Sequence, residues 1–282
     1  MRIALTHDRL SYRFVEILLS VAILGSFSAA AQAQDSTRAP NWYSVIGHDE
    51  RVHVDAAKYP QRSIGYLENG CTGFLIGSRY VLTAAHCMMN GKQLSVPRWF
   101  WPGRNGEPDD YQHTNNKVSV INGLASPEYV DPRLNDWRED YGVLVLKDNI
   151  GATRGFFSYA DKMLMKNWPM SLIGYPIDRK DSPRGTMWKS TCLVGDPAAD
   201  ILRYDCSQWG GNSGGPVFLY YPPYQGYPNG AYVVIGVAVR GPLTVVPADA
   251  SKFWYNEATR LTAPRTKRIR ALIDYFDTQY GA

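Results

Sequence analysis

Residues 207–218 read SQWGGNSGGPVF, with two glycines on each side of the Asn212–Ser213 pair. Glycine adopts backbone conformations that other residues avoid, and it lets another chain approach closely. The glycines, followed by Pro216 and an apolar pair, predict a tight loop that leads into a strand. The same loop presents the Ser213 hydroxyl and can aim the backbone N–H groups of Gly211 and Ser213 at one point, as an oxyanion hole requires.

The segments before and after this loop predict an all-β fold. Between residues 44 and 262 no helical period is sustained, and short apolar runs alternate with turns, which is typical of the strands of a sandwich or barrel. The runs are SIGYL, CTGFLIG, YVLTAA, KVSVI, YGVLVL, MSLIGYP, ILRYDC, PVFLYY and AYVVIGVAV.

The C-terminal residues 263–282 differ and predict one amphipathic α-helix. Apolar residues recur there at intervals of three and four, behind a Thr262 cap and Pro264 in the first turn; they are Ile269, Leu272, Ile273 and Phe276. The helix also carries a basic cluster, which we expect to form a solvated outer face rather than an anion-binding surface; it comprises Arg265, Lys267, Arg268 and Arg270.

The N-terminal residues 1–33 have the pattern of a secretory signal peptide. Three arginines precede an apolar run at 17–27, and Ala31-Gln32-Ala33 is an A-x-A cleavage signal. The run is short for a span of about 30 Å of hydrocarbon, so we expect export and no stable membrane anchor after cleavage. Residues 34–43 are polar and predict a short propeptide. The expected location is secreted or periplasmic.

Composition is that of an ordinary globular protein, with 282 residues, 45% hydrophobic and 20% charged. The formal net charge of +4 comes without a dense basic stripe, so we expect no nucleic-acid partner. The expected partners are protein or peptide substrates, and the expected state is a monomer.

Four cysteines fall into two close pairs, and an exported protein can keep both as disulfides. Pairing each cysteine with its neighbour closes short loops worth roughly 3 kcal/mol each, which favours Cys71 with Cys87 and Cys192 with Cys206 over the other two connectivities. None has the C-x-x-C spacing of zinc or redox sites, so we expect no metal and no cofactor.

Two further stretches supply partners for Ser213. VLTAAHC (81–87) runs from a strand into a corner that presents His86, and the adjacent Cys87 can hold that corner in place. EDYGVLVLK (139–147) places Asp140 at the head of an apolar strand, where a carboxylate can orient an imidazole. Glu139 and Asp136 are the alternatives to Asp140. Base, acid and nucleophile in one exported chain predict nucleophilic catalysis.

The motifs TAAHC, DYGVLVL and GGNSGGPVF resemble the trypsin-like serine proteases of chymotrypsin fold, and within them the bacterial glutamyl endopeptidase branch. The resemblance extends from Ser44 almost to the C-terminus. It implies two antiparallel six-stranded β-barrels, at 44–155 and 156–262, with the C-terminal helix packed on them. It also implies a secreted precursor whose active site lies between the barrels.

The chain departs from the glutamyl branch at the substrate pocket. The resemblance places Ser207, Gln208, Ala238 and Arg240 around that pocket. Ala238 stands where the branch carries a histidine that binds the substrate carboxylate, so we expect an acidic or small polar preference rather than one for glutamate. Arg240 can supply a cation at the pocket mouth or point to solvent.

Asn212 is a second departure, because digestive relatives carry an aspartate there that captures the new N-terminal amine. A neutral Asn212 cannot form that ion pair with the amine of Ser44, so activation is expected to work differently.

Two other functions compete with a protease. A catalytically inactive protease-fold binding protein is one, and a carbohydrate-binding all-β domain is the other. Two aromatic loops could serve either, PRWFWPGRNGEPDD (97–110) and YYPPYQGYPNGAY (220–232). Neither alternative explains why His86, Asp140 and Ser213 occur together.

Overall fold

The computed structural model describes residues 43–106, 116–134, 136–161, 164, 166–195, 200–224, 228–241 and 255–280. The predicted signal peptide and nearly all of the predicted propeptide lie outside these residues, as do parts of both aromatic loops. Among the described residues, none of the helices combines the length and apolarity that crossing a bilayer demands.

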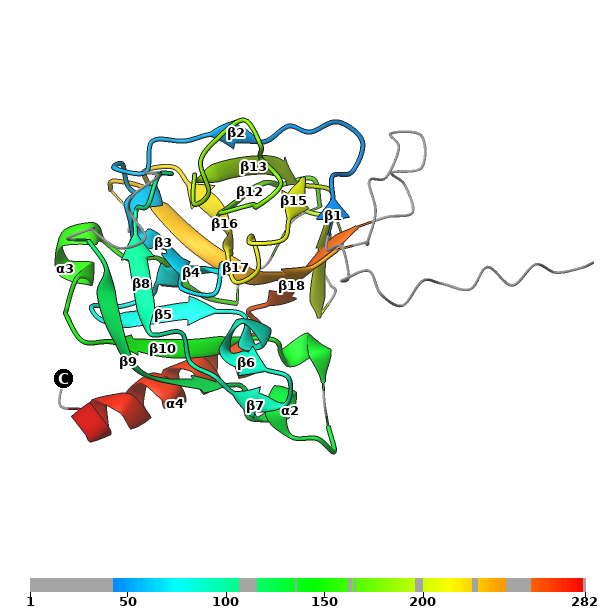
Figure 1. Ribbon diagram of the computed structural model, residues 1–282. Coiled ribbons are helices and arrows are strands. Elements are labelled where there is room, and N and C mark those ends of the chain that lie inside the picture. Colours follow the sequence, from blue (N-terminus) through cyan, green and yellow to red (C-terminus); the bar gives the residue numbers. More distant parts are fainter. Residues whose placement is uncertain are drawn as a thin grey trace, which may run out of the picture. The chain divides into compact units, whose positions relative to one another are not determined.

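The first sheet is a closed antiparallel barrel with the strand order β10-β5-β4-β3-β8-β9 (Figure 1). Every residue of β3, β4, β5 and β10 is buried, which explains why these segments read as continuous apolar runs. The strands are β3 Ile64–Leu67, β4 Thr72–Leu75, β5 Tyr80–Thr83, β8 Trp99–Pro102, β9 Val118–Ala125 and β10 Gly142–Leu146.

The second sheet has eight strands in the order β14-β18-β17-β16-β12-β13-β2, with β11 pairing parallel to β17. Over the described residues this order is open, where a closed barrel of six was expected. The N-terminal strand β2 pairs with β13 and so extends that edge. The strands are β2 Val52–His53, β11 Ser158–Tyr159, β12 Pro169–Gly174, β13 Trp188–Leu193, β14 Ile201–Tyr204, β16 Pro216–Tyr221, β17 Ala231–Arg240 and β18 Asn256–Arg260.

Two two-stranded sheets and several short helices complete the fold. Strand β1 pairs with β15, and β6 pairs with β7. The elements are β1 Tyr43–Ser44, β6 Met89–Asn90, β7 Gln93–Leu94, β15 Gln208–Trp209, the 3-10 helices η1 Gln61–Ser63, η2 Ala85–Met88 and η3 Trp137–Glu139, and the helices α2 Pro127–Val130 and α3 Gly151–Arg154.

Both predicted disulfides are present, Cys71–Cys87 and Cys192–Cys206. Cys192 belongs to β13 and Cys206 follows β14, so the second disulfide joins strands near opposite ends of the open sheet. The first one joins the start of β4 to η2.

One of the three apolar core clusters of the described residues lies between the two sheets. Phe74 of β4 meets Phe157 edge to face at 5.7 Å between ring centroids, and Phe157 contacts Phe218 of β16 at 5.3 Å. Tyr66 of β3 likewise packs edge to face on Tyr175 at 5.5 Å. These rings bury large apolar areas, so they hold the sheets together.

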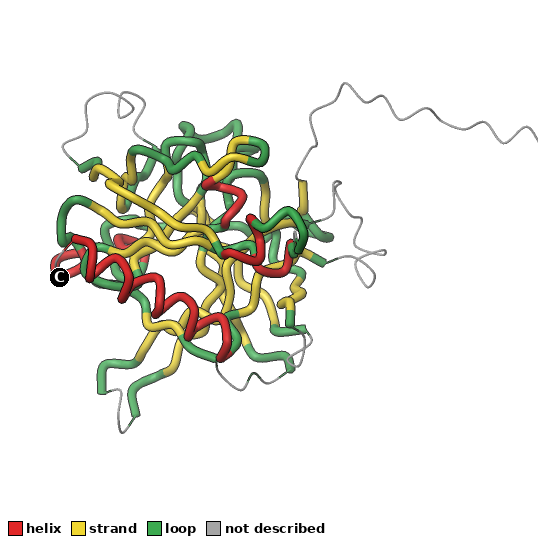
Figure 2. Tube along the Cα trace, turned by 90° about the horizontal axis from the view of Figure 1, so that it is seen from below, coloured by secondary structure: helices red, strands yellow, loops and turns green. Residues whose placement is uncertain are grey.

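Helix α4 (Ala263–Tyr280) packs along the first barrel beside β10 (Figures 1 and 2). Its predicted apolar residues Ile269 and Phe276 are buried, in agreement with the expected amphipathic pattern. The expectation that its basic cluster is solvated is wrong for Arg265, which is 2% exposed. Arg265 is buried because it donates to Glu139 at 2.9 and 3.0 Å and to the carbonyl oxygen of Asp200 at 2.8 Å.

The all-β class, the chymotrypsin-like arrangement and the terminal helix are thus confirmed. Each of the nine predicted runs contributes a strand. Nine strands had no predicted counterpart, namely β1, β2, β6, β7, β8, β11, β13, β15 and β18.

Candidate active site

His86 lies in η2, directly after the buried strand β5, and the Cys71–Cys87 disulfide anchors this turn. Its Nδ1 atom lies 2.7 Å from Asp140 Oδ2, and its backbone N–H donates to Asp140 Oδ1 at 2.9 Å. Two contacts to one carboxylate fix both the position and the orientation of the imidazole. With Nδ1 donating to the carboxylate, Nε2 of the neutral ring is an acceptor.

Asp140 follows η3 and is 6% exposed. The two alternative acids are engaged elsewhere. Glu139 forms the buried ion pair with Arg265, and Asp136 accepts from the backbone N–H of Arg138 at 3.0 Å as the cap of η3. Among the residues that the structure describes, the carboxylate that contacts His86 is therefore that of Asp140.

The charge of Asp140 sets the protonation of its neighbours. Burial lowers the pKa of His86, but the negative charge of Asp140 and its hydrogen bond raise it more, so the net pKa lies above 6.5. Burial, and then the same charge, raise the pKa of Tyr129 to about 12. His86 is thus a stronger base than a free imidazole.

The loop around Ser213 needs its glycines. Gly211 has φ +98°, and a Cβ there would lie 2.1 Å from the carbonyl oxygen of Tyr175. Gly214 has φ +81°, and a Cβ there would lie 2.2 Å from the carbonyl oxygen of Thr72. Within the described part of the chain, the Gly211 and Ser213 amides donate to no protein acceptor. They are available to an oxyanion.

Asn212 lies beneath this loop and is 2% exposed. Its backbone N–H donates to the carbonyl oxygen of Trp209 at 3.0 Å, while its Oδ1 atom has no hydrogen-bond partner among the residues described. Ser44 stands in β1, where it pairs with Gln208.

Thr72 of β4 connects the first barrel to the Ser213 loop. Its Oγ1 donates to the carbonyl oxygen of Gly211 at 2.7 Å, and its N–H donates to the carbonyl oxygen of Ser213 at 2.8 Å. Its own carbonyl accepts from Thr83 Oγ1 at 2.7 Å, and its Oγ1 accepts from the Tyr175 N–H at 3.2 Å. Thr72 is fully buried.

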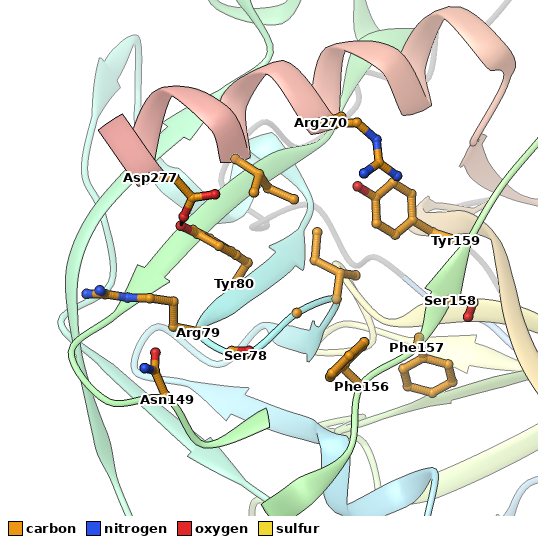
Figure 3. Close-up of a pocket in the computed structure, with 13 residues that line it drawn as sticks. Ser78, Arg79, Tyr80, Asn149, Phe156, Phe157, Ser158, Tyr159, Arg270 and Asp277 are labelled. Atoms are coloured by element: carbon orange, nitrogen blue, oxygen red, sulfur yellow. Dashed lines mark hydrogen bonds between the residues drawn. The ribbon is translucent and has the colours of Figure 1, made fainter. Parts of the chain in front are cut away.

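A cavity of about 490 Å³ brings His86, Asp140 and Ser213 together. Its lining also includes residues that the sequence did not single out, among them Asn69, Tyr129, Trp137 and Arg184. They come from turns and from the one-turn helices α2 and η3, which are too short for a periodic pattern to point to them. A second cavity of about 520 Å³ lies under α4, where Tyr80 bonds Asp277 and Arg270 approaches Tyr159 (Figure 3), and it contains none of the three.

Of the four residues expected around the substrate pocket, one lines the cavity and three do not. Arg240 lines the cavity, whereas Ser207, Gln208 and Ala238 are buried behind it, at 0%, 6% and 0% exposure. Arg240 is not free to move, because its Nε donates to Glu257 at 2.7 Å and its guanidinium lies 3.4 Å from the centroid of the Trp137 ring. Ser207 donates from its N–H and its hydroxyl to Glu50, at 2.7 and 2.6 Å.

Cys71, His86 and Cys87 form a cluster whose atoms could suggest a metal site. The two sulfurs are joined in a disulfide, however, and a metal would need them as thiolates. This cluster is therefore not a metal site.

A closed barrel, an open sheet and a terminal helix around a histidine, an aspartate and a serine define the chymotrypsin-like class. The trypsin family model matches residues 53–227, and the chain belongs to that family.

Known proteins place the chain near the glutamyl endopeptidase branch. Glutamyl endopeptidase of Bacillus licheniformis is 31% identical over 201 residues, which is 67% of this chain and 59% of that protein. An extracellular metalloprotease of Bacillus subtilis is 28% identical over 197 residues, 63% of this chain and 58% of that one. A structure of Glu endopeptidase in complex with MPD shares the fold, with TM-score 0.65 and 23% identity over 81% of this chain and 98% of that chain.

The chain thus spans less than three fifths of the length of these two curated relatives. The residues that the family model matches, 53–227, include His86, Asp140 and Ser213.

Asp140→Asn should lower the pKa of His86 from above 6.5 to below it, because burial of the imidazole then acts without the opposing charge. The pH titration of the His86 imidazole NMR signals measures this. Because folding raises this pKa in the wild type, the resulting stabilisation is present below about pH 6.5 and is lost as the pH rises through the folded-state value. An unchanged pKa in the variant would show that the carboxylate does not control the ring.

Thr72→Val keeps the side-chain shape and removes both contacts of Oγ1. It should lower the free energy of unfolding by about 1–3 kcal/mol, because the buried Gly211 carbonyl and Tyr175 N–H lose a partner. Urea unfolding measures the change. Thr153→Val is the matched control, since that exposed hydroxyl bonds only the Ile150 carbonyl oxygen, and a change within about 0.5 kcal/mol is expected there. Equal effects of the two variants would contradict the role of Thr72.

Proposed function

We propose that the chain is a secreted or periplasmic serine endopeptidase that hydrolyses protein and peptide substrates through a His86–Asp140–Ser213 triad. The observation that carries the proposal is the double contact of Asp140 with His86 at a cavity that Ser213 also lines. Membership of the trypsin family supports it, as do the two disulfides, which suit an exported protein.

The first half of the reaction forms an acyl-enzyme. Ser213 Oγ attacks the substrate carbonyl carbon while His86 Nε2 takes its proton, and Asp140 stabilises the resulting imidazolium. The amides of Gly211 and Ser213 donate to the oxyanion of the tetrahedral intermediate. The C–N bond then breaks, and the amine leaves with the proton that His86 returns.

The second half releases the product. Water attacks the acyl carbon and gives a proton to His86, which hands it to Ser213 Oγ as the ester bond breaks. No cofactor takes part in these steps. Electrostatic stabilisation by preorganised amides needs the backbone conformation at Gly211, whose positive φ glycine adopts readily.

For specificity, the sequence predicted an acidic or small polar preference; of these two we propose the preference for small side chains, without selectivity for glutamate. Ala238 offers no group that could bind a carboxylate, and the Arg240 guanidinium is paired with Glu257. The neutral Ser207 and Gln208 leave the pocket without the buried aspartate that selects basic side chains in trypsin.

Ser213→Ala should abolish labelling by a serine-directed phosphonate and lower kcat for casein hydrolysis by at least about 10⁴-fold, because no other side chain replaces the nucleophile. Fluorescent phosphonate labelling and a casein assay with and without the inhibitor measure the two effects. Ser158→Ala, which removes a largely exposed hydroxyl on β11, is the control and should label like the wild type. Equal labelling of the Ser213 variant would refute the assignment.

A further inference from the structure

The space for the substrate residue before the scissile bond is bounded by two segments beside Ser213. Strand β17 is tied to the Ser213 loop, because the Gly214 N–H donates to the Ala238 carbonyl oxygen at 2.8 Å and the Ala238 N–H donates to that of Gly215 at 2.9 Å. The end of β17 at 239–240 therefore runs past the nucleophile. On the other side the chain runs from β15 through Gly210 to Gly211.

We propose that Gln208 closes this subsite, so that the protease accepts small side chains, alanine, serine or glycine, before the scissile bond. The proposal deepens the proposed function and rests on it. Gln208 lies in β15, in the second of these segments, and its side chain crosses to Arg240 in the first.

Two hydrogen bonds hold the Gln208 side chain in this position. Gln208 Nε2 donates to the carbonyl oxygen of Arg240 at 2.9 Å, and Gln208 Oε1 accepts from the Tyr204 hydroxyl at 2.9 Å. Both ends of the amide are thereby engaged, and the side chain is 94% buried, since 6% of its residue surface is exposed. A large substrate side chain would have to displace it.

Displacing the Gln208 side chain costs free energy because its hydrogen-bond partners are fixed by contacts of their own. Tyr204 is 1% exposed, so its hydroxyl would lose its partner away from water. Arg240 is held by Glu257 on one side and the Trp137 ring on the other. Beneath Gln208, Ser207 is bound at both its N–H and its hydroxyl by Glu50.

The cation of Arg240 is engaged in other contacts. Its guanidinium pairs with Glu257, which also contacts Arg203, and lies against the Trp137 ring, so a substrate carboxylate would have to compete with these partners. Steric exclusion then decides which side chain is accepted before the scissile bond. One methylene changes kcat/KM by about 10–200-fold in an apolar pocket, so a side chain with several additional atoms should be strongly rejected.

The test is a comparison of kcat/KM on a peptide series that differs only at the residue before the scissile bond. The processed wild type, Gln208→Ala and the control Gln93→Ala are each titrated with the phosphonate to count active sites. Gln93 lies exposed on β7, outside the cavity lining. We expect the wild type and the control to prefer alanine over phenylalanine, glutamate and lysine by at least about 10-fold.

In Gln208→Ala the alanine-to-phenylalanine ratio should fall by at least about 10-fold. A wild type that prefers a large side chain, or an unchanged ratio in the variant, would overturn the proposal. If Gln208→Ala fails to fold, Tyr204→Phe decides, because loss of one hydrogen bond to Gln208 should shift the ratio in the same direction and an unchanged ratio refutes the closure. Failure of the wild type to react with the phosphonate or cleave any peptide would instead contradict the proposed function.

Discussion

The geometry of the candidate active site depends on the hydrogen bonds of Thr72, which join the first barrel to the loop that carries Ser213. A buried threonine makes polar contacts only where its partners are correctly placed, because an unmatched hydroxyl or carbonyl away from water is expensive. Thr72 binds the carbonyl oxygens of Gly211 and Ser213. These bonds hold the backbone of the loop that carries the Gly211 and Ser213 N–H groups of the candidate oxyanion hole. A residue on the other sheet therefore supports this loop.

The same stretch of chain also positions the base. Cys71 precedes Thr72 and is bonded to Cys87, which follows His86. Two consecutive residues at the start of β4 therefore anchor both His86 and the Ser213 loop. Such rigid support is what a catalytic geometry requires, since small displacements of reacting groups lower rates strongly. The aromatic contacts between the sheets hold this junction in place.

The acid of the candidate triad has its own support, and it comes from the C-terminus. Glu139, next to Asp140, is paired with the buried Arg265 of α4. A buried ion pair contributes little net stability, but removal of one partner is destabilising. The helix is thus joined to the active-site loop by charge as well as by the packing of Ile269 and Phe276.

The sequence predicted what local patterns encode. Nine apolar runs became strands, the spacing of four cysteines predicted both disulfides, and periodicity predicted α4. The open second sheet and the burial of Arg265 depend on pairings between distant segments, β2 with β13 and Glu139 with Arg265, that no local pattern shows. The two hydrogen bonds of Gln208 likewise require the Tyr204 hydroxyl and the Arg240 carbonyl oxygen to lie within reach of the same side chain. Within residues 207–218, the structure thus gives Gln208 defined hydrogen-bond partners, as it does for the loop around Ser213.

The most direct test is mass spectrometry of the purified, processed protein after reaction with a serine-directed phosphonate. We expect one covalent adduct, mapped by peptide sequencing to Ser213, and formation that slows as the pH falls through the pKa of His86. An adduct on another residue, or no adduct with the folded protein, would contradict this expectation.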